Sequence, residues 1–217
     1  MTIEIFLSVG GTANDKQERF VQAVENRLRA EGFTPNTVGR NTFSVDAPLK
    51  TVEKLMDRCM GTIVLALERS YFPEGLEKRG GSNETGIANV TLPTPWNHIE
   101  AAMSYSRRLP LLVIVQDGLK HEGLLEPGYD WYVQTIPIDE AYLSSPQFNG
   151  VLSSWKDKVE TRLIESSRQP PEAPNDVANM TVGQLFGGLK PSHLWSVLGA
   201  LCAALAGAFS LGAKFWP

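Results

Sequence analysis

Apolar residues in the first 165 positions follow two spacings that alternate along the chain. Short, almost continuous apolar runs are typical of strands buried on both faces, whereas recurrence at every third or fourth position is typical of one face of a helix. The runs predict strands at 3–9, 33–38, 62–67, 111–115 and 133–138, and the periodic stretches predict helices at 15–31, 49–56, 96–107 and 151–164. The long segment 69–95, which is rich in glycine, is predicted to be a loop.

Strands that alternate with helices predict an α/β domain. The expected fold is a flavodoxin- or Rossmann-like parallel sheet of about five strands with helices on both faces. Ligands bind such sheets at the carboxyl ends of the strands. That edge is expected to hold the loops that begin near Ser8, Arg40, Arg69 and Gln116.

The region from Leu194 to Ala213 contains twenty residues and no charge. At about 1.5 Å per residue, a helix of this length spans about 30 Å, the thickness of a bilayer's hydrocarbon core. Trp195 and Trp216 lie near its two ends, as interfacial aromatic residues do. We therefore expect one transmembrane helix, with a buried helix of a soluble core as the alternative.

The expected organisation has three parts: an α/β domain at 1–165, a Pro/Gly-containing linker at 166–193 and a transmembrane helix at 194–213. Gly199, Ala203 and Gly207 recur with a period of four, which would let copies of the helix pack closely and favours a homo-oligomer. The first residues do not resemble a signal peptide. These features predict a single-pass C-terminal tail anchor in the inner membrane, with the soluble domain in the cytoplasm.

The net charge of −4 argues against a nucleic-acid partner, because such domains usually carry a basic stripe. The two cysteines, Cys59 and Cys202, lie in unrelated contexts, and the three histidines are scattered. We therefore predict neither a disulfide framework nor a metal site.

Glu100 is the main candidate for chemistry. It falls in the second turn of the helix expected at 96–107, whose apolar residues Trp96, Ile99, Ala102 and Met103 share one side. A carboxylate at the edge of a pocket can act as a nucleophile or stabilise an oxocarbenium-like state. The structural alternative is a glutamate that caps the helix or forms an ion pair with Arg40, Arg107 or Arg108.

Three short motifs, in the same order, resemble those of TIR domains and of the nucleoside 2-deoxyribosyltransferase-like group. They are Ile5-Phe6-Leu7-Ser8, Glu68-Arg69-Ser70-Tyr71, and Trp96-x-x-x-Glu100 followed by the run Leu109 to Ile114. The resemblance covers residues 3–138. It implies that Glu100 matches the glutamate that acts at the ribose carbon while an N-glycosidic bond breaks. The segment between Tyr71 and Trp96 is longer than the usual TIR spacing.

Other residues at the same sheet edge are candidates for ligand binding. Gly10 and Gly11 could offer backbone N–H groups to a phosphate, or could simply form a turn. Arg40 and Arg69 could bind a phosphate, or could be solvated surface charges. With Glu100, the expected ligand-binding set is completed by Ser8, Tyr71 and Trp96.

The sequence favours one function and leaves a second open. The favoured function is a membrane-anchored, TIR-like effector in bacterial anti-phage defence, which binds a small nucleotide signal such as a cyclic nucleotide and acts at the lipid bilayer as a homo-oligomer. The alternative is an NAD⁺ glycohydrolase or nucleoside deoxyribosyltransferase-like enzyme that uses Glu100. No tightly bound cofactor is predicted, and the ligand would be a cyclic nucleotide or NAD.

Overall fold

The structure is a computed structural model, which describes residues 2–168. Its centre is a five-stranded parallel sheet in the order β2-β1-β3-β6-β7. The strands of this sheet are β1 (Ile3–Val9), β2 (Phe33–Asn36), β3 (Thr62–Ala66), β6 (Leu111–Gln116) and β7 (Tyr132–Ile136). The four α-helices of the described residues are α1 (Asp15–Ala30), α2 (Pro48–Met56), α3 (Pro95–Ser106) and α4 (Pro146–Arg168). Two short 3-10 helices, η1 (Gly123–Leu125) and η2 (Glu140–Ser144), flank β7. The predicted α/β fold is confirmed for this region.

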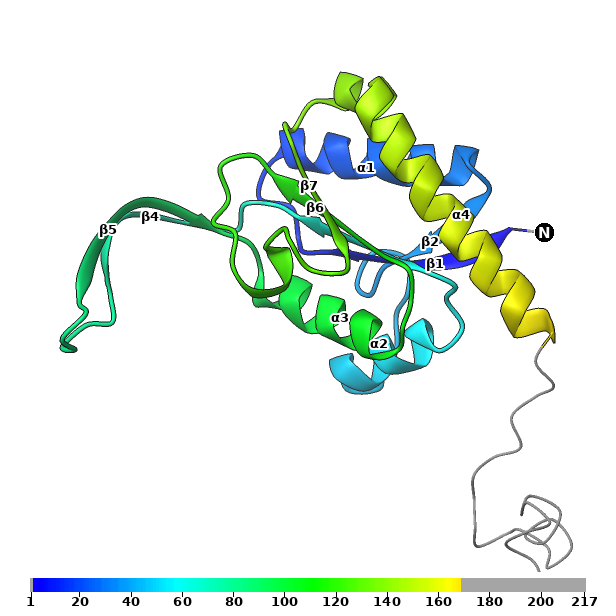
Figure 1. Cartoon of the computed structure of the whole chain (residues 1–217), viewed down its shortest axis with the longest axis horizontal. Helices are drawn as coiled ribbons and strands as arrows, with labels where there is room; N and C mark the ends of the chain where they lie inside the picture. The colour runs from blue at the N-terminus through cyan, green and yellow to red at the C-terminus, as the bar shows by residue number, and fades with distance from the viewer. Residues whose placement is uncertain (1, 169–217) are drawn as a thin grey trace, which may run out of the picture. The chain divides into compact units, whose positions relative to one another are not determined.

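The helices form a layer on each face of the sheet (Figure 1). Alternate residues of a strand point to opposite faces, and both sets are apolar here. Ile5, Leu7 and Ile63 face α1 and α4, where Phe20 and Trp155 join the same core. On the other face, α2 and α3 cover the alternate residues of the same strands, such as Phe6 of β1 and Val64 of β3. Sequence reading identified the strands because burial on both sides left little room for polar residues.

The sheet reverses its direction of growth between β1 and β3. From β1 the chain first adds β2 on one side and then returns to add β3 on the other. The loops that leave β1 and β3 therefore turn to opposite faces of the sheet, and a crevice opens between them. This topology alone makes the carboxyl ends of β1 and β3 the first place to look for a ligand.

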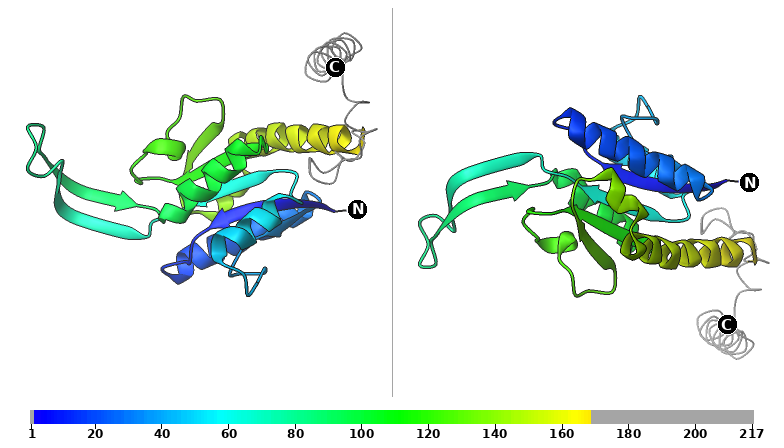
Figure 2. Two further views of the ribbon diagram at one scale, coloured as in Figure 1. Left: turned by 90° about the horizontal axis from the view of Figure 1, so that it is seen from below. Right: turned by 90° about the horizontal axis from the view of Figure 1, so that it is seen from above.

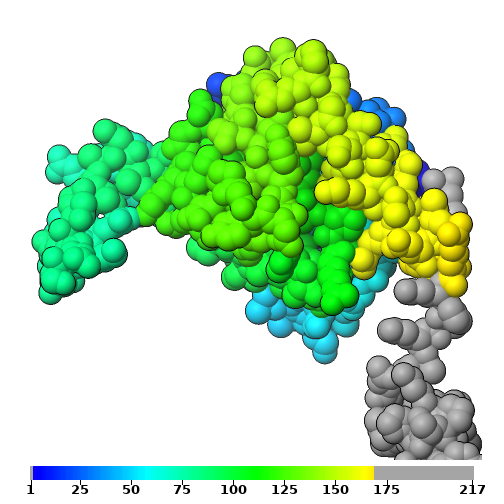
Figure 3. Space-filling model, viewed as in Figure 1, coloured from blue at the N-terminus to red at the C-terminus, as the bar shows by residue number. Residues whose placement is uncertain are grey.

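The segment 69–95 differs from the prediction of a loop. It forms an antiparallel hairpin of β4 (Ser70–Glu77) and β5 (Thr85–Leu92), which extends away from the domain in all three ribbon views (Figures 1 and 2). The space-filling view shows the hairpin as a narrow arm (Figure 3). Because the hairpin lies outside the core, its strands lack the apolar alternation that identifies a buried strand. Without that signal, the glycines of the segment indicated a loop.

Helix α4 is longer than predicted, since it runs from Pro146 to Arg168. The predicted transmembrane helix at 194–213 lies outside the described residues, as does the predicted linker from residue 169 onward. Among the helices at 2–168, none combines the length and hydropathy needed to cross a bilayer.

Candidate functional site

A cleft of about 310 Å³ opens at the carboxyl ends of β1 and β3, where the topology predicts it. Its lining residues come from the ends of β1 and β2, from α2, from the start of the hairpin and from the first turns of α3. They are Val9, Gly10, Gly11, Val38, Pro48, Val52, Arg69, Thr94, Trp96 and Glu100. Five of the predicted ligand-binding residues therefore meet in one cleft.

Gly10 allows the chain after β1 to pass close to the start of α3. A Cβ atom at this position would lie 2.9 Å from Cγ2 of Thr94, closer than carbon atoms pack. Thr94 is the N-cap of α3, and its hydroxyl accepts a hydrogen bond of 3.4 Å from the backbone N–H of Trp96. The glycine thus brings the β1 loop against the first turn of the helix that carries Glu100.

The buried side of α3 is not the apolar side that the sequence indicated. Trp96 and Ile99 remain 40% and 39% exposed, whereas the side chains packed against the sheet are those of Asn97, Glu100, Ala101 and Ser104. Their spacing of three and four places them on one helical face. A helix that turns polar residues toward the core is unusual, because burial of a polar group costs free energy unless it is compensated.

Two of these polar residues form a buried chain of hydrogen bonds with Ser8, which is fully buried in β1. The side-chain amide of Asn97 donates to the Ser8 hydroxyl at 3.0 Å, and the hydroxyl forms a hydrogen bond with the Glu100 carboxyl. Asn97 Oδ1 is buried and has no hydrogen-bond partner within residues 2–168. Ser8 does not line the cleft, but this interaction links it to Glu100, which does.

Burial dominates the electrostatics of Glu100, which is 8% exposed. It raises the pKa of the carboxyl from 4.5 to about 7, although the hydrogen bond from Ser8 acts in the opposite direction. No ion pair of the described chain involves Glu100, since Arg107 pairs with Glu53 and Asp57 instead. A strongly shifted carboxyl in a cleft is a recognised mark of a functional site.

The two predicted arginines have different surroundings. Arg69 lines the cleft, and one of its guanidinium nitrogens lies 3.9 Å from the position that a Cβ of Gly11 would take. Arg40 is bound outside the cleft, where it forms ion pairs of 2.9 Å with Glu18 and 3.1 Å with Glu25. Arg69 is therefore available to a ligand, whereas Arg40 stabilises the contact between α1 and the loop after β2.

Tyr71 is not part of the cleft lining. It lies at the base of the hairpin, is half exposed, and donates a hydrogen bond of 2.6 Å to the Asn89 side chain. The sequence placed Tyr71 in the site because it belongs to the motif Glu68-Arg69-Ser70-Tyr71 at the sheet edge, but it lies on β4, which begins at Ser70 and extends away from the domain (Figure 1).

Two glutamines outside the predicted ligand-binding set hold the loops of the site together. Gln17, which is buried, accepts from the Ala13 N–H at 2.7 Å and donates to the Glu68 carbonyl at 2.9 Å. Gln116, at the end of β6, accepts from the Glu68 N–H at 3.0 Å. These bonds fix the backbone just before Arg69. The sequence placed Gln116 at this edge of the sheet, but it gave no signal for the bonds of either glutamine to the backbone of Glu68, which is distant along the chain.

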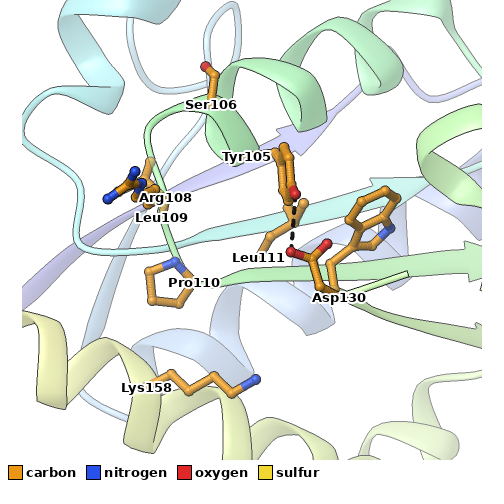
Figure 4. A pocket seen from close by; sticks show the side chains of 9 residues that line it. Tyr105, Ser106, Arg108, Leu109, Pro110, Leu111, Asp130 and Lys158 are labelled. Atoms are coloured by element: carbon orange, nitrogen blue, oxygen red, sulfur yellow. Dashed lines mark hydrogen bonds between the residues drawn. The ribbon is translucent and has the colours of Figure 1, made fainter. Parts of the chain in front are cut away.

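A larger cavity, of about 550 Å³, lies at the opposite end of the sheet (Figure 4). Tyr105, Asp130 and Lys158 are among the residues that line it, and the Tyr105 hydroxyl donates to the Asp130 carboxylate at 3.0 Å. It contains none of the predicted residues and none of the buried ionisable side chains of residues 2–168. We therefore place the candidate site in the smaller cleft, where a buried carboxyl and the switch point of the sheet coincide.

The cleft offers a carboxyl group, a guanidinium group, backbone N–H groups and an aromatic ring. Residues 2–168 contain no group of three His, Cys, Asp or Glu side chains close enough to bind a metal ion. The cleft thus brings the Glu100 carboxyl and the Arg69 guanidinium into one lining.

Comparisons with known proteins give only distant structural likenesses. No family model and no curated protein matches the sequence. Among solved structures, a CMP N-glycosidase from Clostridium botulinum, BcmB, has 13% identity and a TM-score of 0.34, covering 52% of this chain and 72% of its own. The TIR domains of the activated Roq1 resistosome, which recognizes the pathogen effector XopQ, have 12% identity and a TM-score of 0.34, covering 92% of this chain and 99% of their own. Likenesses at this level assign no activity to this chain.

Proposed function

We propose that the cleft binds the ribosyl part of a nucleotide and that Glu100 acts at the anomeric carbon while the N-glycosidic bond breaks. The observation that carries this proposal is the burial of the Glu100 carboxyl at the switch point of the sheet without a cationic partner in the described chain. A structural glutamate on α3 would gain more from an ion pair, such as the one that Arg107 gives to Glu53.

An unpaired buried carboxylate is costly in the resting protein and becomes favourable when positive charge develops beside it. The transition state of N-glycosidic cleavage carries such a charge on the ribose ring. The charge on the ribose ring develops as the bond breaks, so its attraction to Glu100 is strongest in the transition state and lowers the barrier. The Ser8 hydroxyl assists because its hydrogen bond favours the charged form of the carboxyl.

The lining residues narrow the choice of leaving group. Glu100 is the only carboxyl among them, and they include no histidine that could protonate a departing base. A pyridinium ring needs no such proton, because its nitrogen takes the bonding electron pair and leaves as a neutral molecule. Water then adds to the ribose carbon and gives its proton to the Glu100 carboxylate. NAD⁺ fits these conditions better than an ordinary nucleoside.

The size and charge of the cleft agree with this substrate. Its volume of about 310 Å³ is near the lower end of the usual range for ligand sites, which suits one ribosyl half of a dinucleotide. Arg69 supplies the positive charge that a diphosphate needs, and Gly10 and Gly11 leave their backbone accessible beside it. Trp96 offers a ring at the entrance.

The experiment is NAD⁺ turnover by the full chain, measured as nicotinamide release, for the wild type and for Glu100→Gln. Glu160→Gln, an exposed change on α4, is the matched control. We expect release by the wild type and by the control, and a loss of at least 100-fold in Glu100→Gln. Equal rates for wild type and Glu100→Gln would refute the role of Glu100.

A second function is favoured by the position of the cleft at the base of the β4–β5 hairpin. Arg69 directly precedes β4, and Thr94 lies two residues after the end of β5. Both of these cleft-lining residues therefore stand at the base of the projecting hairpin. A ligand that binds without being cleaved would be in contact with the base of this arm and could signal through it. The second candidate is therefore the sensor of a cyclic nucleotide that acts at the membrane in anti-phage defence. Thermal stabilisation by one cyclic nucleotide, without NAD⁺ turnover, would favour it.

A further inference from the structure

The cavity of about 550 Å³ at the end of the sheet opposite to the cleft is a second place where a ligand can bind (Figure 4). Its walls are the last turn of α3, the start of β6, the loop before β7 and the middle of α4. It shares no lining residue with the cleft. Binding sites for small molecules usually have volumes of about 300 to 1,000 Å³, so the cavity has room for one.

One wall of the cavity is aromatic and rigid. The indole of Trp131 donates a hydrogen bond of 3.0 Å to the Leu124 carbonyl, and Tyr129, which lies outside the lining, stacks on it with ring centres 4.7 Å apart. Tyr105 meets Trp131 edge to face, with ring centres 5.3 Å apart. The Tyr105 hydroxyl donates to Oδ2 of Asp130 at 3.0 Å. Because these rings are already held in place, a flat ligand ring can pack against them with little loss of side-chain entropy.

Two cations line the same cavity, and the described chain neutralises neither. The ion pairs of residues 2–168 include neither Arg108 nor Lys158. In Figure 4 both lie apart from the Tyr105–Asp130 pair, Arg108 at the end of α3 and Lys158 on α4. An adjoining hollow also borders the two cations and contains two carboxylates, but these do not line the cavity itself. The nine residues of the lining, all within 2–168, carry two cations and one carboxylate, a net charge of +1.

The backbone at Arg108 has a conformation that favours glycine. Arg108 follows Arg107, the C-cap of α3, and its φ is 54°. Glycine is usual at this position, because a Cβ atom is strained there. The turn is held by the Arg108 N–H, which donates to the Tyr105 carbonyl at 2.9 Å, and by Arg162, which donates to the Arg108 carbonyl at 2.9 Å. An arginine that is kept in a strained position points to a function of its side chain.

We propose that this cavity binds a mononucleotide whose base carries an exocyclic amino group. The base packs against Trp131 and Tyr105. Its amino group donates to Oδ1 of Asp130, since Tyr105 donates to Oδ2. The phosphate binds Arg108 and Lys158, and its two negative charges match the two cations. An amino acid would supply only one carboxylate and would leave one cation without a partner.

The inference is independent of the proposed function, because a mononucleotide in this cavity contacts no residue of the cleft. The first test is calorimetric titration of the full chain, in detergent micelles, with AMP, adenosine, ribose 5-phosphate and inosine monophosphate. We expect AMP to bind at one site per chain with a Kd below about 1 mM. The other three compounds, which lack the phosphate, the base or the amino group, should bind at least tenfold more weakly. The proposal is overturned if AMP does not bind, or if adenosine binds equally well.

The second test locates the bound nucleotide. Lys158→Gln and Arg108→Gly each remove one cation, and each is expected to weaken AMP binding at least tenfold. Lys16→Gln, an exposed change on α1, is the matched control and should bind like the wild type. Arg108→Gly should also raise the unfolding midpoint, because glycine relieves the strained backbone, so its loss of affinity is not a loss of folding. AMP binding that is lost in Arg69→Met and kept in Lys158→Gln would place the nucleotide in the cleft and contradict the proposal.

The third test concerns recognition of the base. In Asp130→Asn the carboxylate is replaced by an amide, whose N–H groups can donate to a carbonyl. The preference for AMP over inosine monophosphate is therefore expected to disappear in this variant. A preference that stays as large as in the wild type would show that Asp130 does not contact the base, and the assignment of the base would then be wrong.

Discussion

The side-chain amide of Asn97 donates a hydrogen bond of 3.0 Å to the hydroxyl of Ser8, and both residues are buried. The bond joins α3 to the end of β1, and it orients the Ser8 hydroxyl for its hydrogen bond with Glu100. A residue of the first strand thus lowers the pKa of a carboxyl that lies ninety-two positions later in the chain.

Ser8→Ala tests this connection. It removes a hydrogen bond that favours the charged form of Glu100, so the pKa of the carboxyl is expected to rise further. Turnover that requires the carboxylate should then need a higher pH, and the acid limb of the pH–rate profile should move upward. The variant also weakens the pairing of a buried Asn97 donor, at a cost of about 1–3 kcal/mol in the free energy of unfolding. Ser153→Ala, on the exposed side of α4, should change neither quantity.

The raised pKa of Glu100 predicts how stability depends on pH. Below about pH 4.5 the carboxyl is protonated in the folded and in the unfolded chain. Between pH 4.5 and about 7 only the unfolded chain loses this proton, so the free energy of unfolding falls as the pH rises. Above pH 7 the difference is constant, at about 3 kcal/mol for a shift of this size.

Glu100→Gln removes this contribution, because the amide carries no charge at any pH. We expect the variant to be more stable than the wild type at pH 8, by up to about 3 kcal/mol, and nearly equal to it at pH 4.5. Urea unfolding at the two pH values measures the difference. A variant that is less stable than the wild type at pH 8 would show that the carboxylate is compensated in the folded protein.

The two glycines after β1 are predicted to respond differently to the same change. In Gly10→Ala the new Cβ meets Thr94, so the loop or the start of α3 must move, at a cost of about 1–3 kcal/mol. In Gly11→Ala the nearest atom is the end of the flexible Arg69 side chain at 3.9 Å, and stability should be unchanged. Thermal unfolding of both variants measures this. Equal destabilisation would mean that the loop is not in close contact with Thr94.

The two arginines are predicted to separate ligand binding from stability. Arg69→Met should raise the KM for NAD⁺ at least tenfold and leave the unfolding midpoint unchanged, because Arg69 lines the cleft. Arg40→Met should leave the KM unchanged and lower stability at neutral pH, because Arg40 pairs with Glu18 and Glu25. A KM that rises with both variants would place Arg40 in the site.

Arg40 also predicts a feature of acid unfolding. Hydrogen bonds from Arg40, the largest cause, and from Thr12 and Gln22 lower the pKa of Glu18 from 4.5 to about 2. A carboxyl of this kind stabilises the fold above pH 4.5, and the contribution is lost as the pH falls toward 2. In Arg40→Met the free energy of unfolding should therefore depend less on pH in this window, and the wild type should depend on it more steeply. Acid titration followed by circular dichroism measures both slopes.

The central sheet could be predicted from the sequence because burial on two faces leaves a simple pattern. The short apolar runs that include Ile63 and Val113 are typical of strands buried on both faces. Their alternation with helices then implies that the strands are parallel. The edge of the sheet that holds Glu100 follows from the same reasoning. These inferences needed only local spacing and the rules of chain connection.

The rest depended on contacts between distant parts of the chain. The hairpin at 70–92 has no core to face, so its residues carry no periodic signal, and it read as a loop. The buried face of α3 was misjudged because Asn97, Glu100 and Ser104 are polar, and their burial is explained only by partners on β1 and β3. Gln17 could not be selected, since both of its bonds are to backbone atoms.

The most direct test of the account is to measure nicotinamide release from NAD⁺ and urea unfolding at pH 8 on the same preparations of wild type and Glu100→Gln. The account predicts that the variant is the more stable of the two and has lost at least 100-fold in turnover, because one buried charge both destabilises the fold and drives the reaction. A variant that is more stable and fully active would contradict it, since Glu100 would then be a buried carboxyl without a part in the chemistry.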